Sequence, residues 1–203
     1  MSKIITAITG ASGSIYAKRL IQVLNESGHH QTILVSNPAV DVLKHELGIS
    51  LSSSNEKIED IIVNSWNLAY PEGIHCEDVS RYHSTIASGS AAAEAMVVIP
   101  CSMGSIARFS QGISSNLIER SFDVMLKEKR KVIVVPRETP LNQIHLRNLL
   151  DLAQLGVDII PAMPAFYHQP KNIQDVVDFV VGRVLEHLGI EHSLYKKWSG
   201  LGQ

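Results

Sequence analysis

The chain has 203 residues and a mass of 22.3 kDa, and 45% of its residues are hydrophobic and 19% charged. These proportions are typical of one globular domain with a sizeable core, and they exclude a disordered or collagen-like chain. With 18 Lys and Arg against 20 Asp and Glu, the formal net charge is −2, which argues against general binding to nucleic acid or anionic membranes. We expect a protein of the reducing cytoplasm, because the chain has only two cysteines, no signal-peptide pattern and only apolar runs too short to cross a bilayer.

The first elements predict a strand, a helix and a second strand. A β-branched run over residues 3–9 stops at Gly10, and apolar residues then recur at helical spacing from Ile15 to Leu24. Gly28 ends this helix, and residues 31–36 supply the next strand. The three segments have the lengths of a βαβ unit.

The next part of the chain is more polar. A helix is expected over residues 39–47. The stretch 50–83 contains serine and proline–glycine segments, and it predicts one helix near Glu59–Trp66 followed by a long surface loop.

The second half begins with Ala95–Cys101, an unbroken apolar run that indicates a strand buried on both faces. Helices and strands then alternate, with helices expected around 117–125, 141–155 and 177–188 and strands at 131–136 and 157–160. This alternation predicts an α/β domain with a doubly wound parallel sheet, a Rossmann- or flavodoxin-like three-layer sandwich. We expect a single domain over residues 1–203, with the segment from about 190 as a tail or oligomer arm.

The informative residues follow the predicted strands. In a doubly wound sheet, ligands bind beyond the carboxyl ends of the strands, where loops and helix N-termini gather. Three such loops carry small hydroxyl or glycine residues that lead into a helix, which suits the approach of backbone N–H groups to a phosphate; these are residues 9–14, 36–37 and 101–105. The first loop has neither the GxGxxG nor the P-loop pattern, so a tight strand–helix turn is its alternative interpretation.

The fourth loop carries an adjacent Arg137–Glu138 pair between Pro136 and Pro140. Such rigid positioning suits groups that meet a substrate. The alternative is a surface salt bridge, with Pro140 at the start of the next helix.

Three other positions carry candidate chemistry. Arg120 and Lys127 lie seven residues apart, so they share one helix face and could bind a second anion. For Lys127 alone, the favoured interpretation is a solvated basic residue at the end of a helix. Cys101, at the end of a buried run, is more typical of a core residue than of a nucleophile. No spacing of His, Cys or carboxylate residues resembles a metal site.

Taken together, the motifs resemble those of the flavin prenyltransferases of the UbiX type, and the resemblance covers nearly the whole chain except residues 50–83. The matching blocks are Gly10-Ala11-Ser12-Gly13 with Tyr16, Ala87-Ser88-Gly89-Ser90, Pro100-Cys101-Ser102-Met103, Asn116-Leu117-Ile118 with Arg120, Leu126-Lys127-Glu128, Pro136-Arg137-Glu138-Thr139-Pro140-Leu141, Ile144-His145-Leu146-Arg147-Asn148 and Met163-Pro164-Ala165-Phe166-Tyr167-His168. Some members place a tryptophan before the Ser-Gly-Ser turn, where this chain has Tyr82.

The resemblance implies that a dimethylallyl group is joined to N5 and C6 of reduced FMN, without a metal ion. It implies dimethylallyl phosphate as the donor, leaving the pyrophosphate open, and a UbiD-type decarboxylase as the recipient of the prenylated FMN. Implied FMN contacts are Gly10, Ala11, Ser12, Ser36, Ser102, Met103, Gly104, Ser105 and Arg137. Implied donor contacts are Ser88, Gly89, Arg120, Lys127, Glu138, Tyr167 and Arg183, with some acting across interfaces of a large homo-oligomer, a dodecamer in the family.

The chemistry of this reaction agrees with those residue types. Breaking an allylic C–O bond develops carbocation character and leaves a phosphate, so cations and hydrogen-bond donors must face the leaving group. Lys127, Tyr167 and Arg183 supply these groups. Glu138 is the candidate acid and base for the proton that leaves the ring carbon, and Ser12 is a candidate proton relay near N5.

Two alternative functions remain open from the sequence. A flavin-dependent cysteine decarboxylase has similar residues around Gly112–Ile118, but its PASANT-like and PxMN segments are replaced here by residues 100–105 and 136–139. A flavin carrier without activity, or an assembly subunit of a decarboxylase, is the other alternative.

Overall fold

The computed structural model describes residues 2–51 and 57–196. Within these ranges six strands form one sheet, β1 (Lys3–Ile8), β2 (His30–Val35), β3 (Ile74–Glu77), β4 (Ala95–Cys101), β5 (Lys131–Pro136) and β6 (Asp158–Ile159). Every neighbouring pair is parallel, and the order across the sheet is β3-β2-β1-β4-β5-β6. This is the Rossmann order: strands are added toward one edge of the sheet from β1 to β3, and toward the other edge from β4 to β6, so the strand order reverses between β1 and β4.

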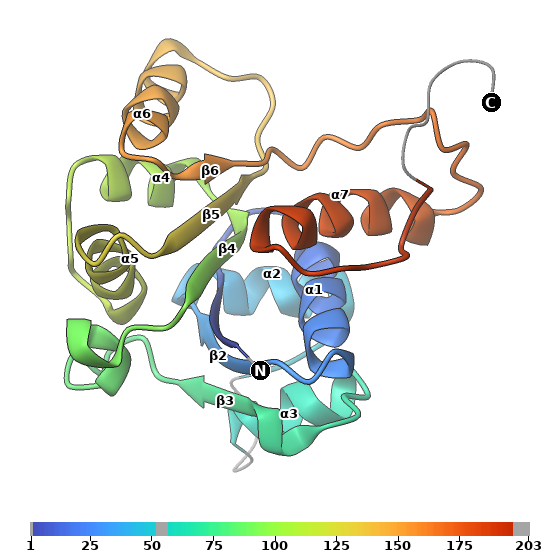
Figure 1. Ribbon diagram of the computed structural model, residues 1–203, viewed down its shortest axis with the longest axis horizontal. Helices are drawn as coiled ribbons and strands as arrows, with labels where there is room; N and C mark the ends of the chain where they lie inside the picture. Colours follow the sequence, from blue (N-terminus) through green and yellow to red (C-terminus); the bar gives the residue numbers. More distant parts are fainter. Residues whose placement is uncertain (1, 52–56, 197–203) are drawn as a thin grey trace.

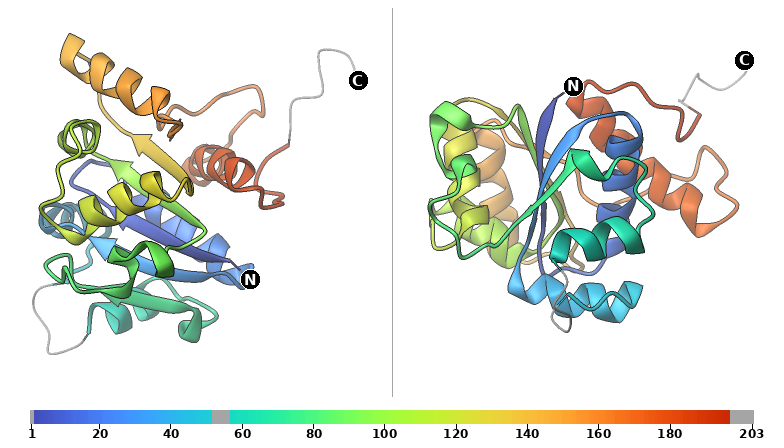
Figure 2. Two further views of the ribbon diagram at one scale, coloured as in Figure 1. Left: turned by 60° about the vertical axis from the view of Figure 1, so that its left-hand side comes forward. Right: turned by 90° about the horizontal axis from the view of Figure 1, so that it is seen from below.

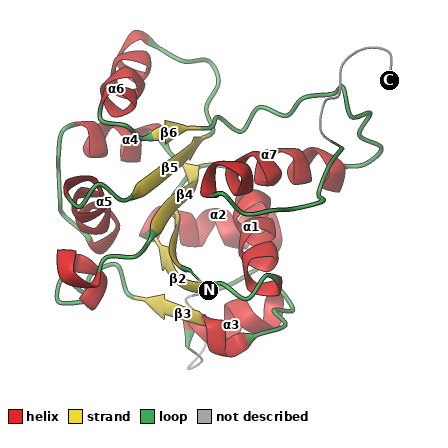
Figure 3. Ribbon diagram, in the orientation of Figure 1, coloured by secondary structure: helices red, strands yellow, loops and turns green. Residues whose placement is uncertain are grey.

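Helices cover both faces of the sheet (Figures 1 and 2). One face carries α1 (Ser14–Glu26), α2 (Asn37–Leu47), α3 (Ile58–Ser65) and α7 (Ile173–Leu188), and the other carries α4 (Met103–Ser110), α5 (Leu117–Lys127) and α6 (Gln143–Gln154). Single 3₁₀ turns lie at Pro71–Gly73, Thr85–Ala87 and Gly89–Ala91. The predicted doubly wound, three-layer α/β fold is therefore confirmed (Figure 3).

The core explains why β4 lies at the centre. All seven of its residues are buried, and successive side chains enter opposite layers. Val97 and Ile99 pack in the core beside α1 and α7, whereas Met96 and Val98 pack beside α4 and α5. An unbroken apolar run is what a strand with two covered faces requires.

The prediction was wrong in one segment of the sheet. The helix near Glu59–Trp66 is present as α3, but the expected surface loop after it contains β3. Among the described strands it pairs with β2 alone, and it carries polar residues, the exposed His75 and the partly buried Glu77. Because an edge strand has one partner and one wet side, it needs no apolar run and leaves little signal in the sequence.

The C-terminal segment folds back onto the domain. Leu194 and Tyr195 pack against the core beside α7, and a Cβ atom at Gly182 would lie 2.5 Å from Tyr195 Cε1 and 2.7 Å from His192 Cε1. Residues 190–196 are thus attached to α7, and the rest of the predicted tail, 197–203, lies outside the described residues. Among the helices that the structure describes, none is both long and apolar enough to span a membrane.

Candidate functional site

The carboxyl ends of β1 and β4 are joined by a buried threonine. The Thr9 hydroxyl donates a hydrogen bond to the Pro100 carbonyl at 2.9 Å and accepts one from the Ser102 N–H at 2.8 Å. Thr9 thereby fixes the two loops at the point where the strand order reverses, which is the usual ligand site of such sheets. Thr9 begins the loop 9–14 predicted from the sequence, but no separate role was predicted for its hydroxyl, although a buried hydroxyl at a strand end is a usable signal.

A pocket of about 190 Å³ opens at this edge. Four predicted cofactor residues from three loops meet in its wall: Gly10, Ser36, Ser102 and Ser105. Asn37, which lies in the predicted loop 36–37, and Asn116, which lies in one of the matching blocks, also line the pocket, whereas Pro38, Val79 and Arg108 were not predicted as functional residues. Val79 belongs to the segment that was predicted as a long surface loop, and Arg108 lies in the helix that follows the predicted loop 101–105.

Local turn chemistry shapes the pocket. The side chains of Ser36 and Ser102 cap α2 and α4 by accepting hydrogen bonds from Ala39 N–H and Ser105 N–H, respectively. The Ser102 and Ser105 hydroxyls are also hydrogen-bonded to each other, at 3.0 Å. At Gly10, a Cβ atom would lie only 2.6 Å from Pro38 Cβ, so glycine lets the β1 loop rest against the start of α2.

The first loop does not present a vacant helix N-terminus. Glu46 of α2 accepts hydrogen bonds from Gly13 N–H at 3.0 Å and Ser14 N–H at 2.7 Å. Partial burial would raise the pKa of Glu46, but hydrogen bonds from Ser12, Ser14 and Gly13 outweigh it and lower the pKa. The carboxylate occupies the anion position that the sequence assigned to a phosphate, so a phosphate there would have to displace Glu46.

The Arg137–Glu138 pair follows β5 at the same edge. Arg137 Nε donates a hydrogen bond to the Ser12 carbonyl at 3.1 Å, which ties the fourth loop to the first. Burial raises the pKa of Tyr16, and Arg137 opposes that rise, which places its charge near the phenol. Glu138 is exposed and accepts a hydrogen bond from Thr139 N–H. Thus Ser12, Arg137 and Glu138 lie together beside the pocket.

Some predicted donor residues lie at the opposite, amino edge of the sheet. Lys127 ends α5 just before β5 begins, and its Nζ lies 3.6 Å from Glu128 Oε1. A Cβ atom at Gly89 would clash with the same Glu128 oxygen, so Ser88 and Gly89 belong to this edge as well. A single chain therefore does not bring them to the pocket.

The remaining donor candidates lie on two different faces. Arg120 is on α5 and pairs with Asp123 at 3.0 Å. Tyr167 stacks edge-on against Phe179 of α7, and Arg183, one turn further along α7, pairs with Glu186. Since α5 and α7 cover opposite faces of the sheet, one chain does not unite Arg120 and Lys127 with Tyr167 and Arg183.

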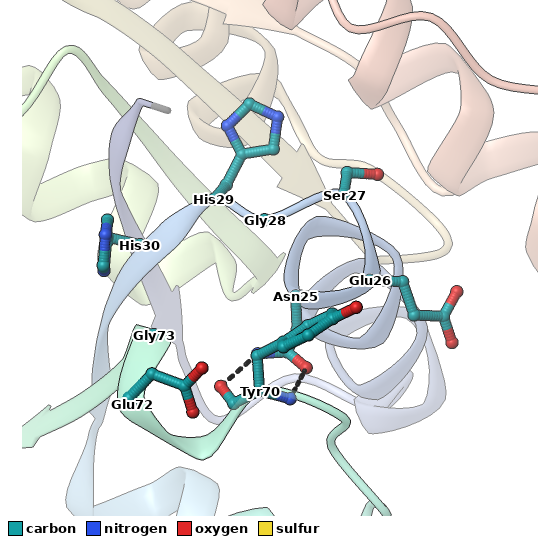
Figure 4. A pocket seen from close by; sticks show the side chains of 9 residues that line it. All are labelled: Asn25, Glu26, Ser27, Gly28, His29, His30, Tyr70, Glu72 and Gly73. Atoms are coloured by element: carbon teal, nitrogen blue, oxygen red, sulfur yellow. Dashed lines mark hydrogen bonds between the residues drawn. The ribbon is translucent and has the colours of Figure 1, made fainter.

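Two further features bear on where the chemistry lies. A larger hollow of about 420 Å³ at the amino edge (Figure 4) is lined by residues such as His29 and Tyr70. Asn25 in that hollow exchanges hydrogen bonds with the Tyr70 backbone, at 2.7 and 3.0 Å, so its polar groups are already satisfied by the fold. Cys101 is fully buried, and burial raises its pKa, which agrees with the predicted core role. The carboxyl-edge pocket remains the better site.

Comparison with known proteins defines the class first. Residues 1–185 match the family model for Flavoprotein. Among solved structures, the fold is similar to that of a dodecameric FMN-dependent UbiX-like decarboxylase from Escherichia coli O157:H7, with a TM-score of 0.84, 35% identity, and coverage of 98% of this chain and 100% of the other. It is also similar to AnUbiX in complex with FMN and dimethylallyl pyrophosphate, with a TM-score of 0.85, 31% identity and 99% coverage of each chain.

The sequence comparison narrows the class. The chain is 44% identical to the flavin prenyltransferase UbiX of Alkalihalophilus pseudofirmus over 199 residues, which cover 98% of this chain and 97% of that protein. Likeness to a PPC decarboxylase, at 15% identity and a TM-score of 0.63, concerns the fold alone. The chain belongs to the UbiX family of flavin prenyltransferases.

Proposed function

We propose that this enzyme joins a dimethylallyl group from dimethylallyl phosphate to N5 and C6 of reduced FMN. The observation that carries the proposal is the convergence of Gly10, Ser36, Ser102 and Ser105 on one pocket, with Ser12, Arg137 and Glu138 beside it. The family membership and the FMN and dimethylallyl pyrophosphate in the AnUbiX complex support the same reaction.

The pocket residues fit one end of FMN. Hydroxyl, amide and guanidinium groups line it, and these donors suit a phosphate and a hydroxyl-rich chain. Its volume of about 190 Å³ is below the roughly 300 Å³ at which sites for whole small molecules begin, so only part of FMN enters it. The ring would then lie outside the pocket, toward Arg137 and Glu138. When bound, reduced FMN supplies the electron-rich ring atoms that accept the prenyl group.

The protein residues hold and protonate groups around that ring. Arg137 is fixed by the Ser12 carbonyl and presents its remaining guanidinium N–H groups at the carboxyl edge. The Ser12 hydroxyl is hydrogen-bonded to the Glu46 carboxylate. Hydrogen bonds from this loop lower the pKa of Glu46, so the carboxylate is ionised at neutral pH. A hydroxyl with a fixed acceptor is suited to relay a proton, and the exposed carboxylate of Glu138 is suited to remove one.

The donor site is assembled from more than one copy of the chain. Lys127, Ser88 and Gly89 lie at the amino edge, and Tyr167 and Arg183 lie on the α7 face, so contact between copies is required to unite them with Glu138. Large apolar side chains are exposed on α6 and on the segment before α7, including Leu150 at 57% and Phe166 at 69% exposure, and they suit such interfaces. The dodecameric E. coli relative supports a large homo-oligomer.

Two finer assignments belong to the same proposal. A UbiD-type decarboxylase would receive the prenylated FMN, because a modified flavin of this kind serves another enzyme's chemistry. A reducing, cytoplasmic setting is supported by Cys76 and Cys101, which are both free.

The test is anaerobic incubation of the enzyme with reduced FMN and dimethylallyl phosphate, or the pyrophosphate, followed by mass spectrometry of the released flavin. We expect a C5H8 mass increment. The Glu138→Gln variant should bind FMN as the wild type does but yield little product. A flavin without the increment for either donor would refute the prenyltransferase assignment, and full product from Glu138→Gln would refute the role of Glu138.

A further inference from the structure

The pocket contains one charged side chain among the residues that the structure places in its wall. Gly10, Ser36, Asn37, Ser102, Ser105 and Asn116 are neutral, and only Arg108 carries charge. Arg137, the cation that the sequence assigned to FMN, does not line this pocket. A phosphate dianion in the pocket would therefore meet Arg108 as its only full positive charge there.

The guanidinium of Arg108 reaches back over the first turn of its own helix. A Cβ atom at Gly104 would lie 3.7 Å from Arg108 Nη1 and 3.9 Å from Ser102 Oγ, so the guanidinium and the side chain that caps α4 both lie close to Gly104. The N–H groups and the partial positive charge at the start of α4 face the same space. Charge from a side chain and charge from a helix terminus thus converge beside the Ser102 and Ser105 hydroxyls.

A nearly buried carboxylate holds Arg108 in this position. Glu119 of α5 is 3% exposed, and its Oε1 accepts a hydrogen bond from Arg108 Nε at 2.6 Å. Its Oε2 accepts from the Ser115 N–H at 2.7 Å and the Ser115 hydroxyl at 2.5 Å. Burial would raise the pKa of Glu119, but the hydrogen bonds from Ser115 and Arg108 outweigh it and lower the pKa.

This arrangement uses only one edge of the guanidinium. Nε is occupied by Glu119, and within the described ranges no hydrogen bond engages Nη1 or Nη2 of Arg108. Because Glu119 fixes the plane of the group, the remaining N–H donors are held in one orientation before any ligand arrives. Such a pre-positioned fork matches the oxygens of a phosphate.

We infer that Arg108, positioned by Glu119, binds the phosphate of FMN and makes the site select phosphorylated flavin over riboflavin. The inference rests on FMN occupying this pocket, as proposed above, and it concerns affinity and selectivity rather than prenyl transfer. The Arg108–Glu119 pair would otherwise serve only to join α4 to α5, and the two roles predict different measurements.

The experiment compares the dissociation constants of oxidised FMN and riboflavin for the full-length protein, by quenching of flavin fluorescence. Arg108→Gln should weaken FMN binding by roughly ten- to a hundredfold, the worth of a hydrogen-bonded charge, and leave riboflavin binding unchanged. Arg108→Lys keeps the charge but not the fork, so it should restore part of the FMN affinity. Arg130→Gln makes the same charge change on an exposed residue outside the pocket and should alter neither constant.

The Glu119→Gln variant separates binding from positioning. It keeps the guanidinium but removes the charge that fixes it, so FMN binding should weaken severalfold with part of the preference over riboflavin retained. Unchanged FMN affinity in Arg108→Gln would overturn the inference. Equal loss of FMN and riboflavin affinity would also overturn it, because a merely structural pair affects both ligands alike. Riboflavin binding by the variant confirms that the site has folded.

Discussion

Substitution of Gly10 by alanine tests whether the β1 loop must rest directly on α2. The added Cβ would lie 2.6 Å from Pro38 Cβ and 3.4 Å from the Pro38 carbonyl carbon. Non-bonded carbon atoms prefer about 3.5–4.0 Å, so the loop or α2 must shift. Neither partner is a flexible side-chain end, because the proline ring is rigid and its backbone begins a helix. Overpacking of this kind costs about 1–3 kcal/mol.

For a chain of this size, about 2 kcal/mol corresponds to a Tm lower by about 4–8 °C. Calorimetry measures that shift, and fluorescence titration measures the accompanying loss of FMN affinity as the pocket wall moves. Gly104→Ala is the matched control: its Cβ would meet only ordinary contacts at 3.7 Å or more, and alanine is favoured over glycine in a helix by up to about 1 kcal/mol. Gly104→Ala should therefore preserve or raise Tm. An unchanged Tm in Gly10→Ala, or equal destabilisation by both variants, would refute the reasoning.

Three further predictions concern polar groups around the site. Glu46→Ala should lower Tm by about 2–4 °C at pH 7, since loss of a helix cap costs about 1 kcal/mol. The pKa of Glu46 is lower in the fold than its ordinary 4.5, so this stabilisation is present above pH 4.5 and is lost as the pH falls through the folded pKa. The difference in Tm between the wild type and Glu46→Ala should therefore close in acid. A difference that stays constant with pH would contradict the role of the ionised Glu46 as a helix cap. Tyr195→Phe removes a hydroxyl that donates a hydrogen bond to Glu186 at 2.9 Å and is also hydrogen-bonded to Arg183. Because Arg183 loses a group that holds it in place, KM for dimethylallyl phosphate should rise severalfold, whereas kcat and FMN affinity should be unchanged. Arg183→Ala should raise the same KM further, and equal loss of FMN affinity would contradict a role in donor binding.

Sequence patterns predicted the elements that a parallel sheet makes distinctive. The apolar run of β4 and the glycine turn after β1 follow from burial on two faces and from a tight strand–helix connection, and both are local in the sequence. The edge strand β3 escaped prediction because a strand with one partner can be polar. Glu46 escaped because it caps a helix that begins 32 residues earlier, and Arg108 because its partner Glu119 lies on another helix. Side chains that act across elements leave no periodicity to detect.

The distribution of the donor residues has a consequence for regulation of the reaction. β4 spans seven residues, or about 23 Å at 3.3 Å per residue, and it separates the FMN pocket at one edge from Lys127 at the other. No lysine side chain covers that distance, so a chain on its own has the flavin end of the site without this donor group. On the proposed assignment, binding of FMN would need only the loops of one carboxyl edge, whereas prenyl transfer would need a second copy to supply the missing cations. Assembly would therefore affect donor binding and turnover more strongly than contacts at the phosphate end of FMN.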